Sequence, residues 1–169
     1  MEIRYSLTEE DYLNFNMFHV KNSKTAKRAL NMQRFLMPII FIVLSYVLSK
    51  VGNMSFFGLL IAFLIVSILW ITFYPKYFYS YVFRNTKKMI KEGKNDGLLG
   101  EHHMVLSEEG IIDLTSNGET KVIWSGIQTL SEDKYNIYLY NSSVSAYILP
   151  KRELNNVDEM KTYLKSKLR

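Results

Sequence analysis

A run of 25 residues without a charged side chain, residues 51–75, constrains the fold of this chain most strongly. As a helix rising ~1.5 Å per residue, it is longer than the ~30 Å hydrocarbon core of a bilayer. More than half of its residues are Leu, Ile, Phe or Val. The alternative, a buried core helix, needs protein on every side of the helix, which a chain of 169 residues supplies poorly. The run therefore predicts a membrane span at about residues 54–75.

A shorter apolar run precedes it. Phe35–Ser49 is free of charge over 15 residues, and Arg34 and Lys50 flank it. Such long basic side chains can extend toward the membrane surface, so a span at about residues 33–50 is predicted. A signal peptide fits less well, because 34 mostly polar residues come first. The two spans form a helical hairpin with a tight turn around residues 50–53.

The basic residues predict the orientation of this hairpin. Eleven Lys and Arg and no Asp or Glu lie between Tyr12 and Lys91, and ten of the eleven lie outside the turn. Cytoplasmic flanks of membrane spans are enriched in Lys and Arg, so both termini are predicted to be cytoplasmic in a multi-pass membrane protein. The net charge of +5 is thus explained without nucleic acid, and nucleic-acid binding is not predicted. The chain has no cysteine, which excludes disulfides and thiolate metal sites.

Helix signals extend beyond both spans and predict a long helical hairpin over residues 8–96. Thr8 and Asp11 have the spacing of a capping box, and no Pro or Gly occurs from there to Met37. The stretch 77–92 also lacks both residues. An aromatic cluster at residues 74–83 has two interpretations: an interfacial belt, or packing against the soluble domain.

Residues 98–169 have a different character. Short alternating runs are divided by turn signals, of which Asn117-Gly118 is the strongest for a hairpin. The pattern predicts strands near residues 101–107, 110–116, 119–124, 126–131, 135–140 and 144–149. An amphipathic helix capped by Asn156 follows. Residues 1–7 alternate as well and are predicted to join this sheet. The fold class is therefore an α+β membrane protein, with a strand and helix order like that of a pleckstrin-homology-like barrel or sheet capped by its C-terminal helix.

Several stretches resemble the YcxB-like family of small bacterial membrane proteins: "RYSLTEEDYLNFN", the two spans, "GEHHMVLSEEGI", "VIWSGIQTL" and "YNIYLYNSSVSAYILPKREL". The resemblance is most specific from Gly100 to Leu154. It implies a pleckstrin-homology-like C-terminal domain in the cytoplasm, with no established enzymatic activity and no catalytic residues. More loosely, it implies a role in immunity to bacteriocins, which some membrane proteins with similar domains provide.

The sequence contains no catalytic, cofactor or metal motif. His102 and His103 are adjacent, and neighbours in a strand point to opposite faces, so they are poorly placed to share a metal ion. Gly-rich phosphate loops, H-E-x-x-H and G-x-S-x-G are all missing from the sequence. We therefore expect no enzymatic activity, no cofactor and no metal.

Three residues are candidates for contact with a partner or with lipid. Trp124 fits either the core of a small β-domain or an exposed anchor for a protein partner. Lys151 and Arg152 follow Pro150, which fits the end of a strand; their alternative role is contact with anionic lipid head groups.

The hypothesis that follows is a non-enzymatic binding or regulatory module, anchored in the inner membrane and acting through its cytoplasmic β-domain. Its expected partners are the lipid bilayer and another membrane or membrane-associated protein. The alternative is an immunity protein that protects its producer from a membrane-active bacteriocin or toxin. A homo-oligomer is a third hypothesis, because Gly58 and Ala62 have a small-xxx-small spacing.

Overall fold

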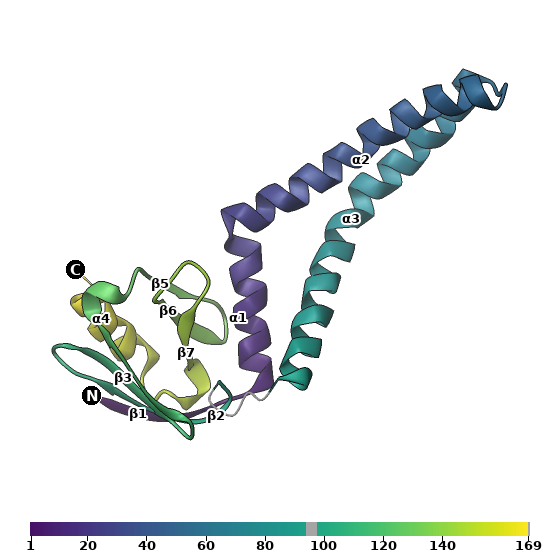
Figure 1. Cartoon of the computed structure of the whole chain (residues 1–169). Coiled ribbons are helices and arrows are strands. Elements are labelled where there is room, and N and C mark those ends of the chain that lie inside the picture. Colours follow the sequence, from purple (N-terminus) through teal and green to yellow (C-terminus); the bar gives the residue numbers. More distant parts are fainter. Residues whose placement is uncertain (94–97, 169) are drawn as a thin grey trace. The chain divides into compact units, whose positions relative to one another are not determined.

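The computed structural model describes residues 1–93 and 98–168 and has an α+β fold (Figure 1). In chain order the elements are β1 (Glu2–Leu7), α1 (Glu9–Asn22), α2 (Lys24–Val51), α3 (Phe56–Glu92), β2 (Gly100–Leu106), β3 (Gly110–Thr115), β4 (Gly118–Ile123), the 3₁₀ turn η1 (Trp124–Gly126), β5 (Thr129–Glu132), β6 (Asn136–Tyr140), β7 (Ala146–Pro150), the 3₁₀ turn η2 (Lys151–Glu153) and α4 (Val157–Lys167). The predicted boundary between hairpin and β-domain falls at residues 96–98, and residues 94–97 lie outside the described part of the chain.

The chain forms two compact units, and one is inserted in the sequence of the other. Met1–His19 and the chain from Thr86 onward form the β-domain, whereas Val20–Asn85 forms a helical hairpin. The N-terminal strand therefore reaches the β-domain although the entire hairpin separates it from the other strands in sequence.

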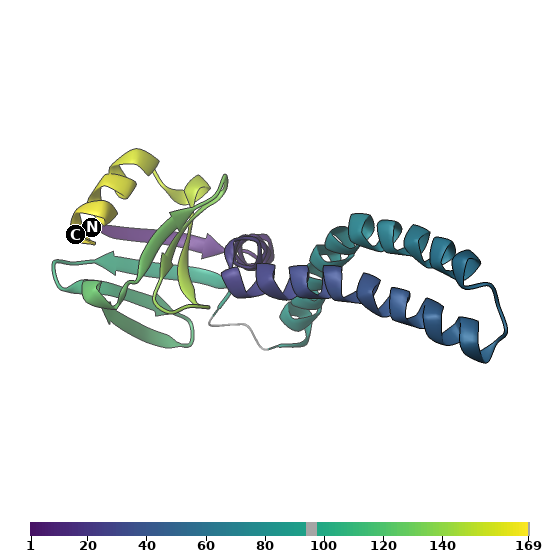
Figure 2. The same cartoon turned by 90° about the horizontal axis from the view of Figure 1, so that it is seen from above.

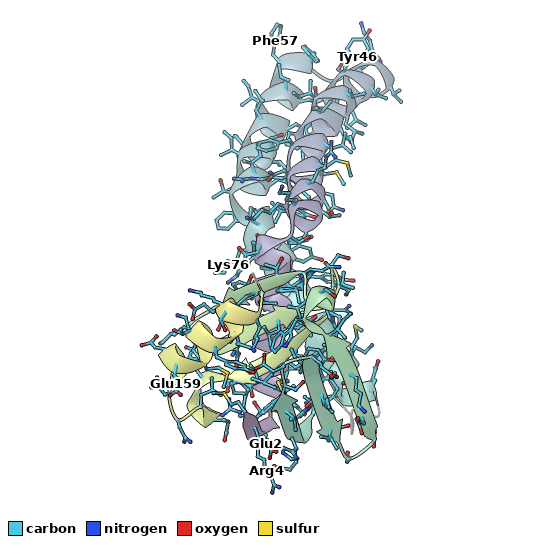
Figure 3. The ribbon with its side chains drawn as sticks, turned by 90° about the vertical axis from the view of Figure 1, so that its left-hand side faces the viewer. Glu2, Arg4, Tyr46, Phe57, Lys76 and Glu159 are labelled. Carbon is cyan, nitrogen blue, oxygen red and sulfur yellow. The ribbon has the colours of Figure 1, made fainter. Side chains whose placement is uncertain are left out.

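In the hairpin, α2 and α3 lie side by side and are joined at the tip by a short turn (Figure 1). Gly52 ends α2 and donates its N–H to the carbonyl of Leu48, and Asn53 has a φ of 50°. Asn tolerates this left-handed conformation better than most residues, which suits it to a tight reversal. Figure 3 labels Tyr46 and Phe57 near this tip and Lys76 toward the other end of the hairpin.

Aromatic and polar contacts hold the two helices together. Phe41 stacks on Phe63 with ring centroids 5.9 Å apart. Farther from the tip, Arg34 Nε donates to the carbonyl of Ile71 at 2.9 Å. This hydrogen bond pairs a side-chain N–H with a backbone carbonyl inside the hairpin, as a low-dielectric environment requires.

The outward faces of both helices are apolar. Ile39 and Val43 of α2, and Ile65 and Ile68 of α3, are each more than half exposed. Both helices are long and apolar enough to cross a membrane. Such continuous apolar surface is unfavourable in water, so the pattern indicates association with a membrane.

The long helix predicted from Thr8 onward is interrupted. The structure confirms its start, because the Asp11 N–H bonds to Thr8 Oγ1 while Thr8 N–H donates to the Asp11 carboxylate. At Ser23, however, the backbone is extended (φ −65°, ψ 124°), and Ser23 Oγ accepts the N–H of Ala26. The uninterrupted helix was therefore a wrong expectation. A serine that caps a new helix can break a run that contains neither Pro nor Gly.

Four strands form the first antiparallel sheet, in the order β1-β2-β3-β4. β1 pairs with β2 over its whole length, from Glu2 opposite Val105 to Leu7 opposite Gly100. Its alternate residues Ile3, Tyr5 and Leu7 are buried. Glu2 and Arg4 are exposed, and Figure 3 labels both at the margin of the β-domain.

The second antiparallel sheet has the order β5-β6-β7 and crosses the first (Figure 2). Two predicted strands begin later than expected. The strand predicted at 126–131 begins at Thr129, and the one predicted at 144–149 begins at Ala146 and runs to Pro150. The strand predicted at 119–124 ends at Ile123, because Trp124 opens the turn η1 that leads from one sheet to the other.

The core of the β-domain lies between the two sheets and α4. Ile137 and Leu139 of β6 are fully buried, and Met160 and Leu164 of α4 join the same cluster. Asn156 caps α4 by accepting the N–H of Glu159. The amphipathic stripe of α4 therefore covers one side of this core, as its periodicity predicts.

Candidate functional site

The β-domain contains a cavity of about 480 Å³. Its walls come from β1 to β4, the first half of α1, and residues 141–148, which include the loop between β6 and β7. Tyr5 and Tyr147 contribute aromatic surface. The cavity thus combines strands of both sheets and lies entirely within one compact unit.

A buried histidine and a buried aspartate line this cavity from neighbouring strands. His102 of β2 is opposite Thr115, and Asp113 of β3 is opposite Met104, so the two residues form a diagonal pair. His102 Nδ1 and Asp113 Oδ2 are 2.9 Å apart, and both side chains are about 7% exposed. Tyr5, directly opposite His102 on β1, stacks on the imidazole with ring centroids 5.1 Å apart. The strand registers therefore bring the three residues together.

This pair leaves polar atoms without partners. In the described part of the chain, three buried side-chain polar atoms have no hydrogen-bond partner: His102 Nε2, Asp113 Oδ1 and Asn141 Oδ1. All three belong to residues that line the cavity. Buried polar atoms are usually paired, because leaving one unpaired costs about 1–3 kcal/mol. The unpaired atoms of the β-domain are therefore grouped on residues of one cavity wall.

The described lining residues carry two carboxylates and one imidazole, that of His102. Asp113 and Glu119 are among them, and Lys and Arg are not. Burial, followed by the nearby Asp113 carboxylate, raises the pKa of the Tyr5 hydroxyl well above its usual value. The Tyr5 hydroxyl therefore stays neutral and adds no charge to the cavity wall.

His103 lies on the other face of β2. Its Nε2 is 3.2 Å from Glu2 Oε2 on the neighbouring strand, away from His102. This arrangement follows from the alternation of side chains along a strand. Within residues 1–93 and 98–168, no group of three or more metal-binding side chains is present.

Trp124 lies in the core rather than on the surface. Its side chain is about nine-tenths buried, and its Nε1 donates to the carbonyl of Ser107 at 3.0 Å. Its ring meets Tyr163 of α4 edge to face at 6.4 Å. The structure thus gives Trp124 a packing role between the turn η1 and α4.

Lys151 contacts other parts of the β-domain. Lys151 Nζ lies 2.6 Å from Glu132 Oε2 and also donates to the carbonyl of Asp133. Hydrogen bonds from Lys151 and Lys161 lower the pKa of Glu132 from 4.5 to about 2. The ammonium group of Lys151 is therefore already engaged within the protein.

Arg152 joins the turn η2 to the N-terminal segment. Its guanidinium donates two hydrogen bonds to the Asp11 carboxylate, at 2.6 and 2.8 Å, and one to the carbonyl of Ser6 at 2.9 Å. A bidentate pair of this kind is geometrically specific. Neither Arg152 nor Lys151 nor Trp124 lines the cavity, so the predicted contact residues and the cavity are separate features.

Replacing Arg152 with Met should destabilise the β-domain. Burial raises the pKa of Asp11, but hydrogen bonds from Arg152 and Thr8 outweigh it and hold the pKa below 3.8. Without the guanidinium, the buried carboxylate loses its two hydrogen bonds from Arg152, and we expect a loss of about 1–3 kcal/mol in urea unfolding at neutral pH. Lys165→Met, on the exposed face of α4, is the matched control and should change little.

The effect of Arg152→Met should depend on pH. Because the folded-state pKa of Asp11 is depressed, its stabilisation is present above about 3.8 and is lost as the pH falls through the folded-state value. The difference between the native chain and the variant should therefore shrink below that pH. A difference that stays constant into strong acid would show that the Asp11 pair is not its cause.

Fold and cavity together define a class of protein: an α+β protein whose β-domain holds a ligand-sized cavity and whose inserted helix pair is suited to a membrane. The family model described as YcxB-like protein matches residues 106–165, from the end of β2 into α4. The chain therefore carries a YcxB-like domain, and the resemblance inferred from the sequence is confirmed over this segment. Neither the curated proteins nor the solved structures contain a match to the chain.

No sequence motif points to the cavity residues. The His102-His103 pair suggests only a metal ligand, and no motif includes Asp113 or Asn141. One signal was present, because alternation along β2 places His102 on the same face as Met104 and Leu106, which are buried. A histidine and an aspartate on the inward faces of neighbouring strands could therefore have been recognised.

Proposed function

We propose that this chain is a non-enzymatic binding or regulatory module anchored in the bacterial cell membrane by α2 and α3. Its β-domain acts on the cytoplasmic side and binds its partner there. The observation that carries this proposal is the combination, in one chain, of an apolar helix pair with a separately cored domain that holds an open cavity. No chemical step is required of such a module.

The order of elements supports a pleckstrin-homology-like assignment for the β-domain. Seven antiparallel strands in two sheets are followed by one amphipathic helix that buries its stripe against them. Domains of this architecture are commonly binding platforms, although a fold alone does not specify a ligand. The proposal therefore rests on the cavity and the anchor rather than on the fold class.

The anchor explains why a small domain would benefit from a membrane hairpin. A tethered domain meets membrane-associated partners at a high effective concentration, so modest affinity is sufficient. The bilayer is one partner in this proposal, and a membrane or membrane-associated protein is the other.

Both termini should be cytoplasmic if the proposal is correct. Basic residues are concentrated on the two outer flanks of the hairpin, and the turn contributes only Lys50. Reporter fusions to the N-terminus and to the C-terminus should each give a cytosolic signal, and a reporter inserted at Gly52 should give an external one. An external signal from either terminus would contradict the two-span arrangement.

Capture of a partner tests the binding role. A photocrosslinking residue placed at Val144, an exposed residue of the cavity wall, should trap a defined partner or ligand in native membranes. The same residue at Tyr135, which is also exposed but does not line the cavity, is the matched control. Identical products from both positions would argue against the cavity as the binding site.

A further inference from the structure

We infer that the cavity of the β-domain binds a primary ammonium group. This inference rests on the proposed binding role and adds the chemical class of the ligand. It is carried by the three unpartnered polar atoms, by the charge of the cavity wall and by its aromatic surface.

The unpartnered atoms require hydrogen-bond donors. The carboxylate and amide oxygens of Asp113 and Asn141 are acceptors. When His102 donates its Nδ1–H to the Asp113 carboxylate, its Nε2 becomes an acceptor too. An –NH₃⁺ group carries donors and no acceptor, so it is the kind of group that acceptors on this wall would bind.

The charge of the wall supports the same ligand. Asp113 and Glu119 place two carboxylates on the wall, and His102 beside Asp113 is the one base among the described lining residues, which include no Lys or Arg. A cationic ligand would balance this excess of carboxylates, whereas an anion would add to it. The site therefore selects against phosphate and carboxylate ligands.

The aromatic rings accommodate the rest of such a molecule. Tyr5, Tyr12, Phe15 and Tyr147 line the cavity. Their faces attract a cation electrostatically and their edges pack against a short alkyl chain. A small alkylamine therefore fits the wall both by charge and by polarity.

Four probes of equal chain length test the inference on the full-length protein. The protein is held in phosphatidylcholine nanodiscs, whose lipids carry no N–H donor, and binding is followed by NMR of labelled histidine side chains. Butylammonium should bind saturably and shift the His102 signal. Butyltrimethylammonium lacks N–H donors, 1-butanol lacks a charge, and butyrate carries a negative charge. Each of the three should therefore bind at least tenfold more weakly than butylammonium. Equal binding of 1-butanol or butyrate, or no saturable binding of butylammonium, would overturn the inference.

Variants locate the binding. Asp113→Asn removes the charge with little change of shape and should weaken butylammonium at least tenfold, whereas Asp158→Asn on α4 should leave it unchanged. Should Asp113→Asn fail to fold, Asn141→Ala provides the second test and should weaken binding several-fold. Equal weakening by Asp158→Asn and by the cavity variants would overturn the assignment to this cavity.

Two further probes distinguish the sources of the ammonium group. Ethanolamine represents a free small amine, and glycerophosphoethanolamine represents a lipid head group with the same amine. The probe that binds with the higher affinity identifies the source of the ammonium group. If a partner is crosslinked at Val144 but no amine binds, the proposed binding role stands and the inference of an ammonium ligand is rejected. The two proposals can therefore fail independently.

Discussion

Deletion of residues 2–6 is expected to unfold much of the β-domain while both membrane helices remain inserted. The deletion removes all of β1 except Leu7, and this strand pairs with β2 across its whole length. It also removes Ile3 and Tyr5, which are at least nine-tenths buried in the core. Two truncations of large core side chains cost together about 4–10 kcal/mol, comparable with the whole stability of a typical domain.

Amide exchange measured strand by strand provides the test. Protection across residues 100–150 should fall sharply in the deleted chain, and resistance to alkaline extraction from membranes should persist. Replacing Glu2 and Arg4 with Ala is the matched control, because both are exposed on the same strand and pairing would survive. Unchanged protection after the deletion would mean that β1 is dispensable and that the hairpin is not an insertion into the β-domain.

Trp124→Ala is expected to lower the free energy of unfolding by about 3–5 kcal/mol. The indole is about nine-tenths buried, contacts Tyr163 of α4 and satisfies the carbonyl of Ser107. Removing it leaves a cavity between η1 and α4 and an unpaired acceptor. Urea unfolding of the full chain, followed by a signal from the β-domain, measures the change.

The neighbouring Ile123→Ala is the control for this substitution. Ile123 is 63% exposed at the end of β4, so its truncation should change stability by well under 1 kcal/mol. A Trp124→Ala chain as stable as the Ile123→Ala chain would return Trp124 to the role of a surface anchor for a partner.

Local patterns in the sequence predicted several features that the structure contains. The two apolar runs correspond to α2 and α3, since the hydrophobicity of a span is a property of consecutive residues. Thr8 and Asn156 cap helices where expected, because a cap depends on residues three positions apart. Alternation predicted a strand at the N-terminus, and β1 occupies Glu2–Leu7.

Some errors arose where local preferences compete. Ser23 begins a new helix in a stretch that lacks helix breakers, because a capping side chain can end the preceding helix. Trp124 fits a strand by its type, but it lies in a 3₁₀ turn because the chain must pass there from one sheet to the other. In both places the local pattern allows either conformation, and the structure has the one that the surrounding chain path requires.

The sequence by itself determined the membrane-compatible helices, the α+β class, the helix caps at Thr8 and Asn156 and the resemblance to the YcxB-like family. Only the tertiary structure decided which distant residues meet. Arg152 reaches Asp11 across 141 positions, and His102 meets Asp113 only because of the register between β2 and β3. Sequence patterns reflect neighbours within a few residues, whereas these contacts depend on strand pairing and chain topology. The cavity and its unpartnered polar atoms follow from that pairing, and no local pattern specifies them.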